Sequence, residues 1–233
     1  MAELTKTAVV TGATGFVGSH VVATLLSAGY LVRGSVRSLA NKTKIAPLEA
    51  IAKDSPGTLE LFEADLLTPG AFAEAADGAD VFFHVASPFL MLEQMTEPEK
   101  DVFEPARLGT GHVIDAINGA ESVKRLVLTS TVGAIFGDYS DVHDQMGGVL
   151  SERYFNTTST LENNPYHYAK TVAEKMAWQA QAAQDRWSMV TINPGLILGP
   201  TITPGSESGS LFLLDELLGG QFWFGAPNFS FTV

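Results

Sequence analysis

Residues 7–20 constrain the fold more than any other part of this 233-residue chain. An apolar, β-branched run ends at Thr11, three glycines follow within seven residues, and an amphipathic pattern begins directly afterwards. This order predicts a strand, a tight turn and the start of a helix. Backbone at such a turn can approach a phosphate closely, and the unpaired N–H groups of the helix attract the anion. Glycines alone also serve ordinary turns, so the prediction of a dinucleotide site depends on the strand before them and the helix after them. The residues assigned to the site here are Gly12, Thr14, Gly15, Phe16, Val17 and Gly18.

Strand-like runs recur along the chain with helical patterns between them. Strands are expected near residues 7–11, 31–37, 58–63, 80–85, 124–130 and 188–193, and helices near 16–28, 42–53, 69–76, 99–119 and 166–184. This alternation predicts an α/β fold with a doubly wound, mostly parallel sheet. Residues 135–164 are polar and rich in turn residues, which indicates a surface insertion.

Proline and glycine cluster after Leu196, and a short helix is expected near 210–218. Residues 228–233 alternate like a strand that ends on an apolar residue, which indicates that the natural chain continues. We therefore expect a Rossmann-type nucleotide-binding domain over residues 1–195 and the start of a substrate-binding lobe over 196–233.

Composition excludes several classes of function. The chain has no cysteine, so it has no disulfide, thiolate metal site or cysteine nucleophile, and its five histidines lack metal-ligand spacing. Its net charge of −12 argues against nucleic acid and anionic membrane as partners. No stretch is long and apolar enough to span a membrane, and the amino terminus does not read as a secretory signal. We expect a cytoplasmic protein without a metal.

The end of the second strand bears on the choice of nucleotide. In dinucleotide-binding units an acid at this point holds the ribose 2′-hydroxyl, whereas an arginine accommodates a 2′-phosphate. Here the residue is Arg37, and Arg33, Lys42 and Lys44 are close in sequence. A guanidinium can pair with a phosphate in two-pronged fashion, so NADP(H) is favoured over NAD. The alternative is a solvated basic loop.

Three further strand ends are expected at the same edge of the sheet. Asp65 follows the third strand and either meets adenine or belongs to a turn. The fourth strand runs into Val85-Ala-Ser-Pro88, whose small residues let a cofactor lie across the edge. Asn193-Pro-Gly195 closes the sixth strand and could face the nicotinamide, although turn chemistry alone explains it equally well. The cofactor residues assigned in these segments are Asp65, Leu66, Val85, Ala86, Ser87, Pro194 and Gly195.

Tyr166 and Lys170 give the strongest catalytic signal. Four residues apart on a helix, they share a face and lie one turn apart. A phenol titrates near about 10, and a nearby ammonium favours the phenolate. We expect Lys170, together with a cationic nicotinamide ring, to lower the pKa of Tyr166 toward neutrality. Tyr168 is the competing phenol, but no lysine follows it at the same spacing.

The fifth strand ends in three consecutive hydroxyl residues, Thr129 to Thr131. Thr131 or Ser130 could donate a hydrogen bond to a substrate carbonyl as negative charge develops on its oxygen. The alternative is that these hydroxyls satisfy backbone groups.

Taken together, the chain resembles the extended short-chain dehydrogenases/reductases, in the branch of dihydroflavonol 4-reductase, cinnamoyl-CoA reductase and the yeast-type methylglyoxal and ketone reductases. The segments that carry the resemblance are Thr11–Gly18, Gly29–Arg37, Phe83–Pro88, Arg125–Ser130, Lys170–Trp178 and Asn193–Gly195.

The resemblance implies NADPH-dependent carbonyl reduction. It assigns Arg37 and Lys44 to the 2′-phosphate, Asp65 to adenine, and Tyr166 to proton donation. It assigns Lys170 to the nicotinamide ribose and to tuning Tyr166. The catalytic serine of the family aligns on Thr131, which leaves open whether Ser130 takes its part.

The leading hypothesis is thus a reductase of ketones or aldehydes with a small-molecule carbonyl substrate. Alternatives are an NAD-dependent sugar-nucleotide epimerase or dehydratase, which shares the glycine turn and the Tyr–Lys pair, and a non-catalytic NADP-binding regulatory module.

Overall fold

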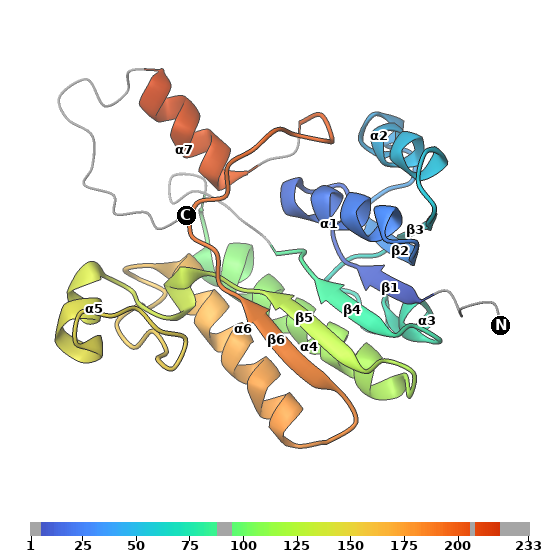
Figure 1. Cartoon of the computed structure of the whole chain (residues 1–233). Coiled ribbons are helices and arrows are strands. Elements are labelled where there is room, and N and C mark those ends of the chain that lie inside the picture. The colour runs from blue at the N-terminus through green and yellow to red at the C-terminus, as the bar shows by residue number, and fades with distance from the viewer. Residues whose placement is uncertain (1–5, 88–94, 206–207, 220–233) are drawn as a thin grey trace.

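A six-stranded parallel sheet forms the centre of the molecule (Figure 1). The computed structural model describes residues 6–87, 95–205 and 208–219. The strand order is β3-β2-β1-β4-β5-β6, and every neighbouring pair is parallel. The strands are β1 (Thr7–Val10), β2 (Leu31–Val36), β3 (Thr58–Glu63), β4 (Val81–His84), β5 (Arg125–Thr129) and β6 (Ser188–Ile192).

Helices cover both faces of the sheet. The α-helices are α1 (Phe16–Ser27), α2 (Lys42–Lys53), α3 (Ala73–Ala76), α4 (Glu104–Gly119), α5 (Tyr139–Met146), α6 (Pro165–Ala182) and α7 (Gly209–Leu218). One core cluster joins α1 and α2 to one face, and a second joins α3, α4 and α6 to the other. The predicted doubly wound α/β fold is confirmed.

The strand order places the candidate residues together. The chain passes from β1 outward to β2 and β3, then returns past β1 to β4, so the order reverses between β1 and β4. In open parallel sheets, ligands bind outside the carboxyl ends of the strands at such a reversal. The glycine turn follows β1 directly, and Val85 and Ala86 follow β4 at the neighbouring position.

Two expected helices differ from their predicted form. Helix 69–76 is reduced to Ala73–Ala76, because Gly70 adopts a left-handed φ of 77° that breaks the helix before it. The segment expected as a helix over 99–119 is a π-helical turn, η2 (Glu99–Phe103), followed by α4. Pro105 at the start of α4 has no N–H to donate one turn back, which explains the irregular turn.

The 135–164 insertion contains α5, a helix that was not predicted. The helix is short and polar, so it has no apolar stripe, but Asp138 and Asp141 form a capping box around its first turn. Asp141 is buried and accepts hydrogen bonds from the Gly137 N–H at 2.9 Å and the Thr158 hydroxyl at 2.6 Å. Burial opposes its charge, but these hydrogen bonds outweigh burial and hold the pKa of Asp141 below its usual value. Asp141 thereby ties α5 to the loop that leads to α6.

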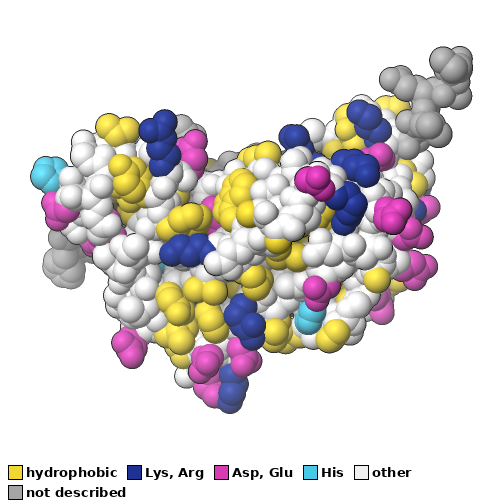
Figure 2. All heavy atoms as spheres, turned by 90° about the horizontal axis from the view of Figure 1, so that it is seen from below, with side chains coloured by type: hydrophobic (Ala, Val, Ile, Leu, Met, Phe, Trp, Pro, Cys, Tyr) yellow, Lys and Arg dark blue, Asp and Glu magenta, His cyan; other side chains and the backbone are white. Residues whose placement is uncertain are grey.

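The surface seen in Figure 2 shows acidic side chains lying among the basic ones, with hydrophobic side chains between them. No helix in the described ranges is both long and apolar enough to cross a bilayer. Pro88 and the strand expected at 228–233 lie outside the described residues.

Candidate active site

The glycine turn is built so that backbone groups face outward at the start of α1. Gly12 has a φ of 67°, a left-handed conformation that side chains disfavour. A Cβ on Gly18 would lie far inside van der Waals contact with the carbonyl oxygen of Gly12. Gly15 caps α1 without a side-chain hydrogen bond, and no acid lies in the first turn of the helix. The first N–H groups of α1 are therefore placed to receive an anion.

Two hydroxyl residues that the sequence analysis did not assign hold this turn in place. In β2, Ser35 accepts the Gly12 N–H on its hydroxyl at 3.0 Å and the Ala13 N–H on its carbonyl at 2.9 Å. Thr11 accepts the N–H groups of Val85 and Ala86 on its hydroxyl, at 3.0 and 2.9 Å. The turn is thus fixed to the ends of β2 and β4. Ser35 gave no signal beyond a small polar residue within a strand.

His84, at the end of β4, is buried. Its ring nitrogens lie 3.0 Å from the Thr11 hydroxyl oxygen and 3.3 Å from that of Thr110 in α4. Burial, and then the charge of Lys170, lower the pKa of His84 to about 3. The ring is therefore neutral at physiological pH. Within the described ranges, no cluster of acids and histidines could hold a metal.

The basic residues near β2 divide into two groups. Arg37 follows β2 and is exposed, and it makes no hydrogen bond or ion pair with any described residue. Lys44 lies in the first turn of α2, where Asn41 caps its N–H. Arg33, by contrast, points to α3 and donates to the carbonyl oxygens of Ala75 and Asp77. Only Arg37 and the α2 lysines remain available to a phosphate.

Asp65 and Leu66 lie beyond β3 in a turn. The Asp65 carboxylate accepts the Leu67 N–H at 2.7 Å, which is the turn alternative considered from the sequence. The carbonyl oxygen of Leu66 lies 2.7 Å from a ring nitrogen of His112 in α4. The Asp65 carboxylate thus stabilises the turn after β3. A contact between Asp65 and adenine stays a prediction.

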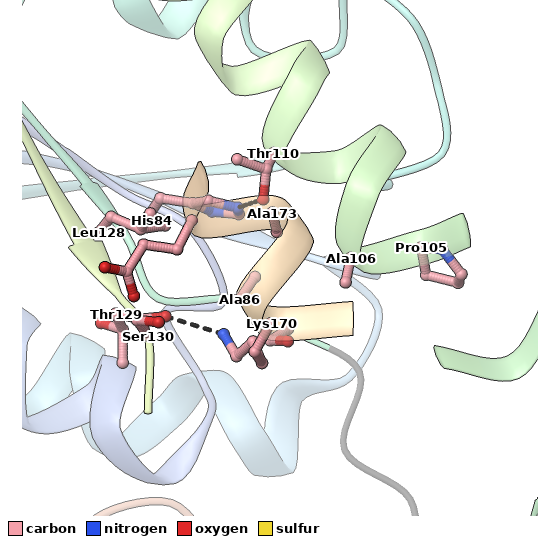
Figure 3. A pocket seen from close by; sticks show the side chains of 12 residues that line it. His84, Ala86, Pro105, Ala106, Thr110, Leu128, Thr129, Ser130, Lys170 and Ala173 are labelled. Atoms are coloured by element: carbon pink, nitrogen blue, oxygen red, sulfur yellow. Dashed lines mark hydrogen bonds between the residues drawn. The ribbon is translucent and has the colours of Figure 1, made fainter. Parts of the chain in front are cut away.

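Lys170 reaches from α6 to the end of β5. Its ammonium donates to the Thr129 carbonyl oxygen at 2.8 Å, the hydrogen bond drawn dashed in Figure 3. Burial lowers the pKa of Lys170 to about 8, and the carboxylate of Glu174 partly opposes this shift. Lys170 lines a small pocket together with Ala86, Ser87, Ser130 and residues of α4 and α6. Residues that follow β4 and β5 therefore lie beside Lys170 of α6 at this pocket.

The expected direction of the Tyr166 pKa is wrong for this structure. Burial raises the pKa of Tyr166 to about 12. The ring packs beside Val102, Ala106 and Ala169, in apolar surroundings that disfavour a phenolate. The Lys170 ammonium is held on Thr129 instead of stabilising that anion. The phenol is therefore protonated at neutral pH.

The two candidate hydroxyls at the end of β5 have different surroundings. The Thr131 hydroxyl accepts the Gly133 N–H at 3.2 Å and donates a long hydrogen bond of 3.4 Å to the Pro194 carbonyl oxygen. Ser130 is only 4% exposed and lines the Lys170 pocket. Its hydroxyl has no hydrogen-bond partner among the described residues. The turn after β6 closes this end of the site, because Pro194 O also accepts the Val132 N–H at 3.0 Å. Beyond that turn, Thr203 donates to the carbonyl oxygen of Thr14 at 2.8 Å and so lies against the glycine turn.

Comparison with known proteins identifies the family. The model described as the NAD dependent epimerase/dehydratase family matches residues 8–214. The chain belongs to this family.

Several of the proteins that this chain resembles are reductases. A cinnamoyl-CoA reductase of Medicago truncatula is 34% identical over 226 residues, which cover 95% of this chain and 66% of the relative. A dihydroflavonol 4-reductase of Gerbera hybrida is 35% identical over 215 residues, which cover 92% of this chain and 58% of the relative. The crystal structure of Gre2 from Candida albicans in complex with NADPH is 30% identical, with a TM-score of 0.73, over 97% of this chain and 68% of that one.

These matches confirm the predicted resemblance to the extended short-chain reductases. The chain spans 58–66% of the lengths of the two curated relatives. All of the residues assigned to the cofactor lie within the matched family region of residues 8–214.

Proposed function

We propose that this chain forms the NADPH-binding and proton-donating part of a reductase that converts ketones or aldehydes to alcohols. The observation that carries the proposal is the convergence of three elements at one edge of the sheet. These are the glycine turn before α1, the exposed Arg37 after β2, and the Tyr166–Lys170 helix beside the hydroxyl residues that end β5.

The residues at the edge suit a phosphorylated dinucleotide. The glycine turn leaves no room for a Cβ at Gly18, and α1 begins there without a side-chain cap, so its N–H groups suit a pyrophosphate. Arg37 and Lys44 would hold the 2′-phosphate, and Lys170 the nicotinamide ribose. When bound, NADPH supplies the hydride. Similar proteins whose crystal structures contain NADPH support this choice.

The chain's own residues would supply the proton. Tyr166 is a protonated phenol at neutral pH, as a proton donor to the carbonyl oxygen must be when the reaction begins. The hydroxyl of Ser130 or Thr131 would donate a hydrogen bond to the same oxygen. Ser130 is supported by its buried hydroxyl, which has no partner in the described part of the chain. Thr131 is supported by the family resemblance and by its long hydrogen bond to the Pro194 carbonyl oxygen, which a substrate could replace.

A panel of ketones and aldehydes tests the function, with NADPH consumption followed by absorbance. Because the relatives are longer, the chain is assayed beside a version extended at its carboxyl end. We expect NADPH-dependent reduction of at least one carbonyl class by the extended version. Tightly bound NAD in the purified protein, together with no reduction of any member of the panel, would favour the epimerase or dehydratase alternative.

Arg37→Glu tests the nucleotide. The change removes a charge-assisted pair and places a carboxylate near a phosphate, so we expect NADPH to bind about 50-fold more weakly and NADH within about threefold of its former affinity. Titration of both nucleotides by intrinsic fluorescence measures this. Lys124→Glu, which has the same charge change at the amino end of β5, is the matched control. Equal losses for the two nucleotides in Arg37→Glu would contradict the role of Arg37.

A further inference from the structure

Glu174 is a buried carboxylate that neither the sequence analysis nor the proposed function uses. It lies on α6, four residues after Lys170 and eight after Tyr166, so the three side chains share one face of the helix. Glu174 is 6% exposed and Lys170 is 7% exposed. A carboxylate this deep costs free energy unless hydrogen bonds and an opposite charge compensate it.

Each oxygen of Glu174 accepts a hydrogen bond from a neutral donor. Oε1 accepts from the indole N–H of Trp178 at 3.3 Å, one helical turn further on. Oε2 accepts from the side-chain amide of Asn193 at 2.9 Å, in the turn after β6. Each oxygen of this buried carboxylate therefore has a hydrogen-bond partner.

Asn193 extends this arrangement to the end of β5. Its side-chain amide nitrogen also donates to the Thr131 carbonyl oxygen at 3.2 Å. One amide group thus uses its two hydrogens to join α6 to the segment that carries both candidate carbonyl donors. The adjacent Val132 N–H is bound to the Pro194 carbonyl oxygen, so the same turn holds this segment twice.

The other side chains around Lys170 are neutral, so Glu174 supplies the opposite charge. Among the residues that the structure describes, Glu174 is the only acid lining the pocket that contains the Lys170 ammonium. From β4 the pocket receives His84, which is neutral, and from β5 and α4 it receives the hydroxyl residues Thr129, Ser130 and Thr110. On α6 itself, Tyr166 is a neutral phenol at physiological pH.

We propose that Glu174 is a positioning residue with two effects: its charge keeps the buried Lys170 protonated, and through Asn193 it fixes the Thr131 segment at the end of β5. The hydrogen bonds from Asn193 to Glu174 and to Thr131 involve only residues of this chain. The consequence for catalysis rests on the proposed function, in which a protonated Lys170 serves the reaction.

The test is an NMR titration of the lysine side chains, ¹³C-labelled next to the ammonium, in the chain without nucleotide. Lys170→Met identifies the resonance. We expect a Lys170 midpoint near 8 in the wild type. In Glu174→Gln we expect the midpoint to fall by about one pH unit or more, because the opposing charge is gone. Glu121→Gln, an exposed acid before β5, is the matched control and leaves the midpoint unchanged. An unchanged midpoint in Glu174→Gln overturns the charge role.

Two further measurements separate the effects and do not depend on the folding of Glu174→Gln. In the wild type, the chemical shift of the Glu174 carboxyl carbon responds to the charge of the nearby ammonium, so it is expected to change at the Lys170 midpoint. The absence of this change counts against the proposal. Asn193→Ala keeps every charge, so it is expected to leave the Lys170 midpoint near 8 and to shift the amide resonances of Val132 and Gly133. A midpoint that falls by about one pH unit or more in Asn193→Ala, or unmoved amides, overturns the positioning role. Neither readout requires turnover. A failure of the protein to reduce carbonyls would therefore contradict the proposed function without contradicting the role of Glu174.

Discussion

Replacing Tyr166 by phenylalanine is expected to lower kcat for carbonyl reduction about 1000-fold, since a positioned general acid contributes about that much to the rate. The ring would keep its packing beside Val102, Ala106 and Ala169, so we expect the free energy of unfolding and the NADPH affinity to stay close to those of the wild type. Steady-state kinetics with a substrate from the carbonyl panel, together with nucleotide titration, measure both quantities.

Tyr168→Phe is the matched control for this change. Tyr168 lies two residues further along α6 and stacks on Phe103, with ring centroids 5.5 Å apart. Removing its hydroxyl keeps that stacking and is expected to leave kcat within about twofold, because the ring geometry supplies the contact. Full turnover by Tyr166→Phe, or an equal loss in both variants, would rule out Tyr166 as the proton donor.

Gly18→Ala is expected to destabilise the fold by roughly 3 kcal/mol, at the upper end for overpacking, because the added methyl group meets backbone and not a side chain that can rotate away. The Cβ would collide with the carbonyl oxygen of Gly12, so α1 must move away from the turn. That movement displaces the N–H groups proposed to hold the pyrophosphate, and we expect NADPH and NADH to lose affinity together. Thermal unfolding and titration of both nucleotides measure the two effects.

Gly111→Ala in α4 is the control for adding the same methyl group. A Cβ there would meet only the end of Met176 at 4.0 Å, an ordinary contact. Alanine is the better helix former by about 1 kcal/mol, so we expect unchanged or slightly raised stability and unchanged nucleotide binding. If Gly18→Ala behaves like Gly111→Ala, neither stability nor nucleotide binding depends on the close packing of α1 on the glycine turn.

The parts of the molecule that the sequence predicted are those with strong local patterns. The apolar strands and the glycine turn carry their signal within a few residues, and all six expected strands occur within one or two residues of their predicted ends. The missed helix α5 has a different origin, since its stability comes from the Asp138–Asp141 cap and from Thr158 instead of an apolar stripe.

The site was harder to predict where it depends on contacts between distant segments. Ser35 and Thr11 support the glycine turn through bonds to residues 23 to 75 positions away, which no local pattern reveals. The pKa of Tyr166 moved opposite to expectation because spacing along a helix says nothing of burial or of a competing acceptor for Lys170. Arg33 is near Arg37 in sequence, but it points to α3.

The hydrogen bonds around Thr11 determine which nitrogen of His84 carries its proton. The Thr11 oxygen accepts two backbone N–H groups, so both lone pairs are occupied and its own hydrogen must go to Nδ1 of His84. The neutral ring therefore carries its hydrogen on Nε2 and donates to Thr110. A second proton on this ring would leave two donors facing each other at Thr11. The directions of the two hydrogen bonds that run from Thr11 through His84 to Thr110 in α4 are thus fixed by one uncharged tautomer of His84.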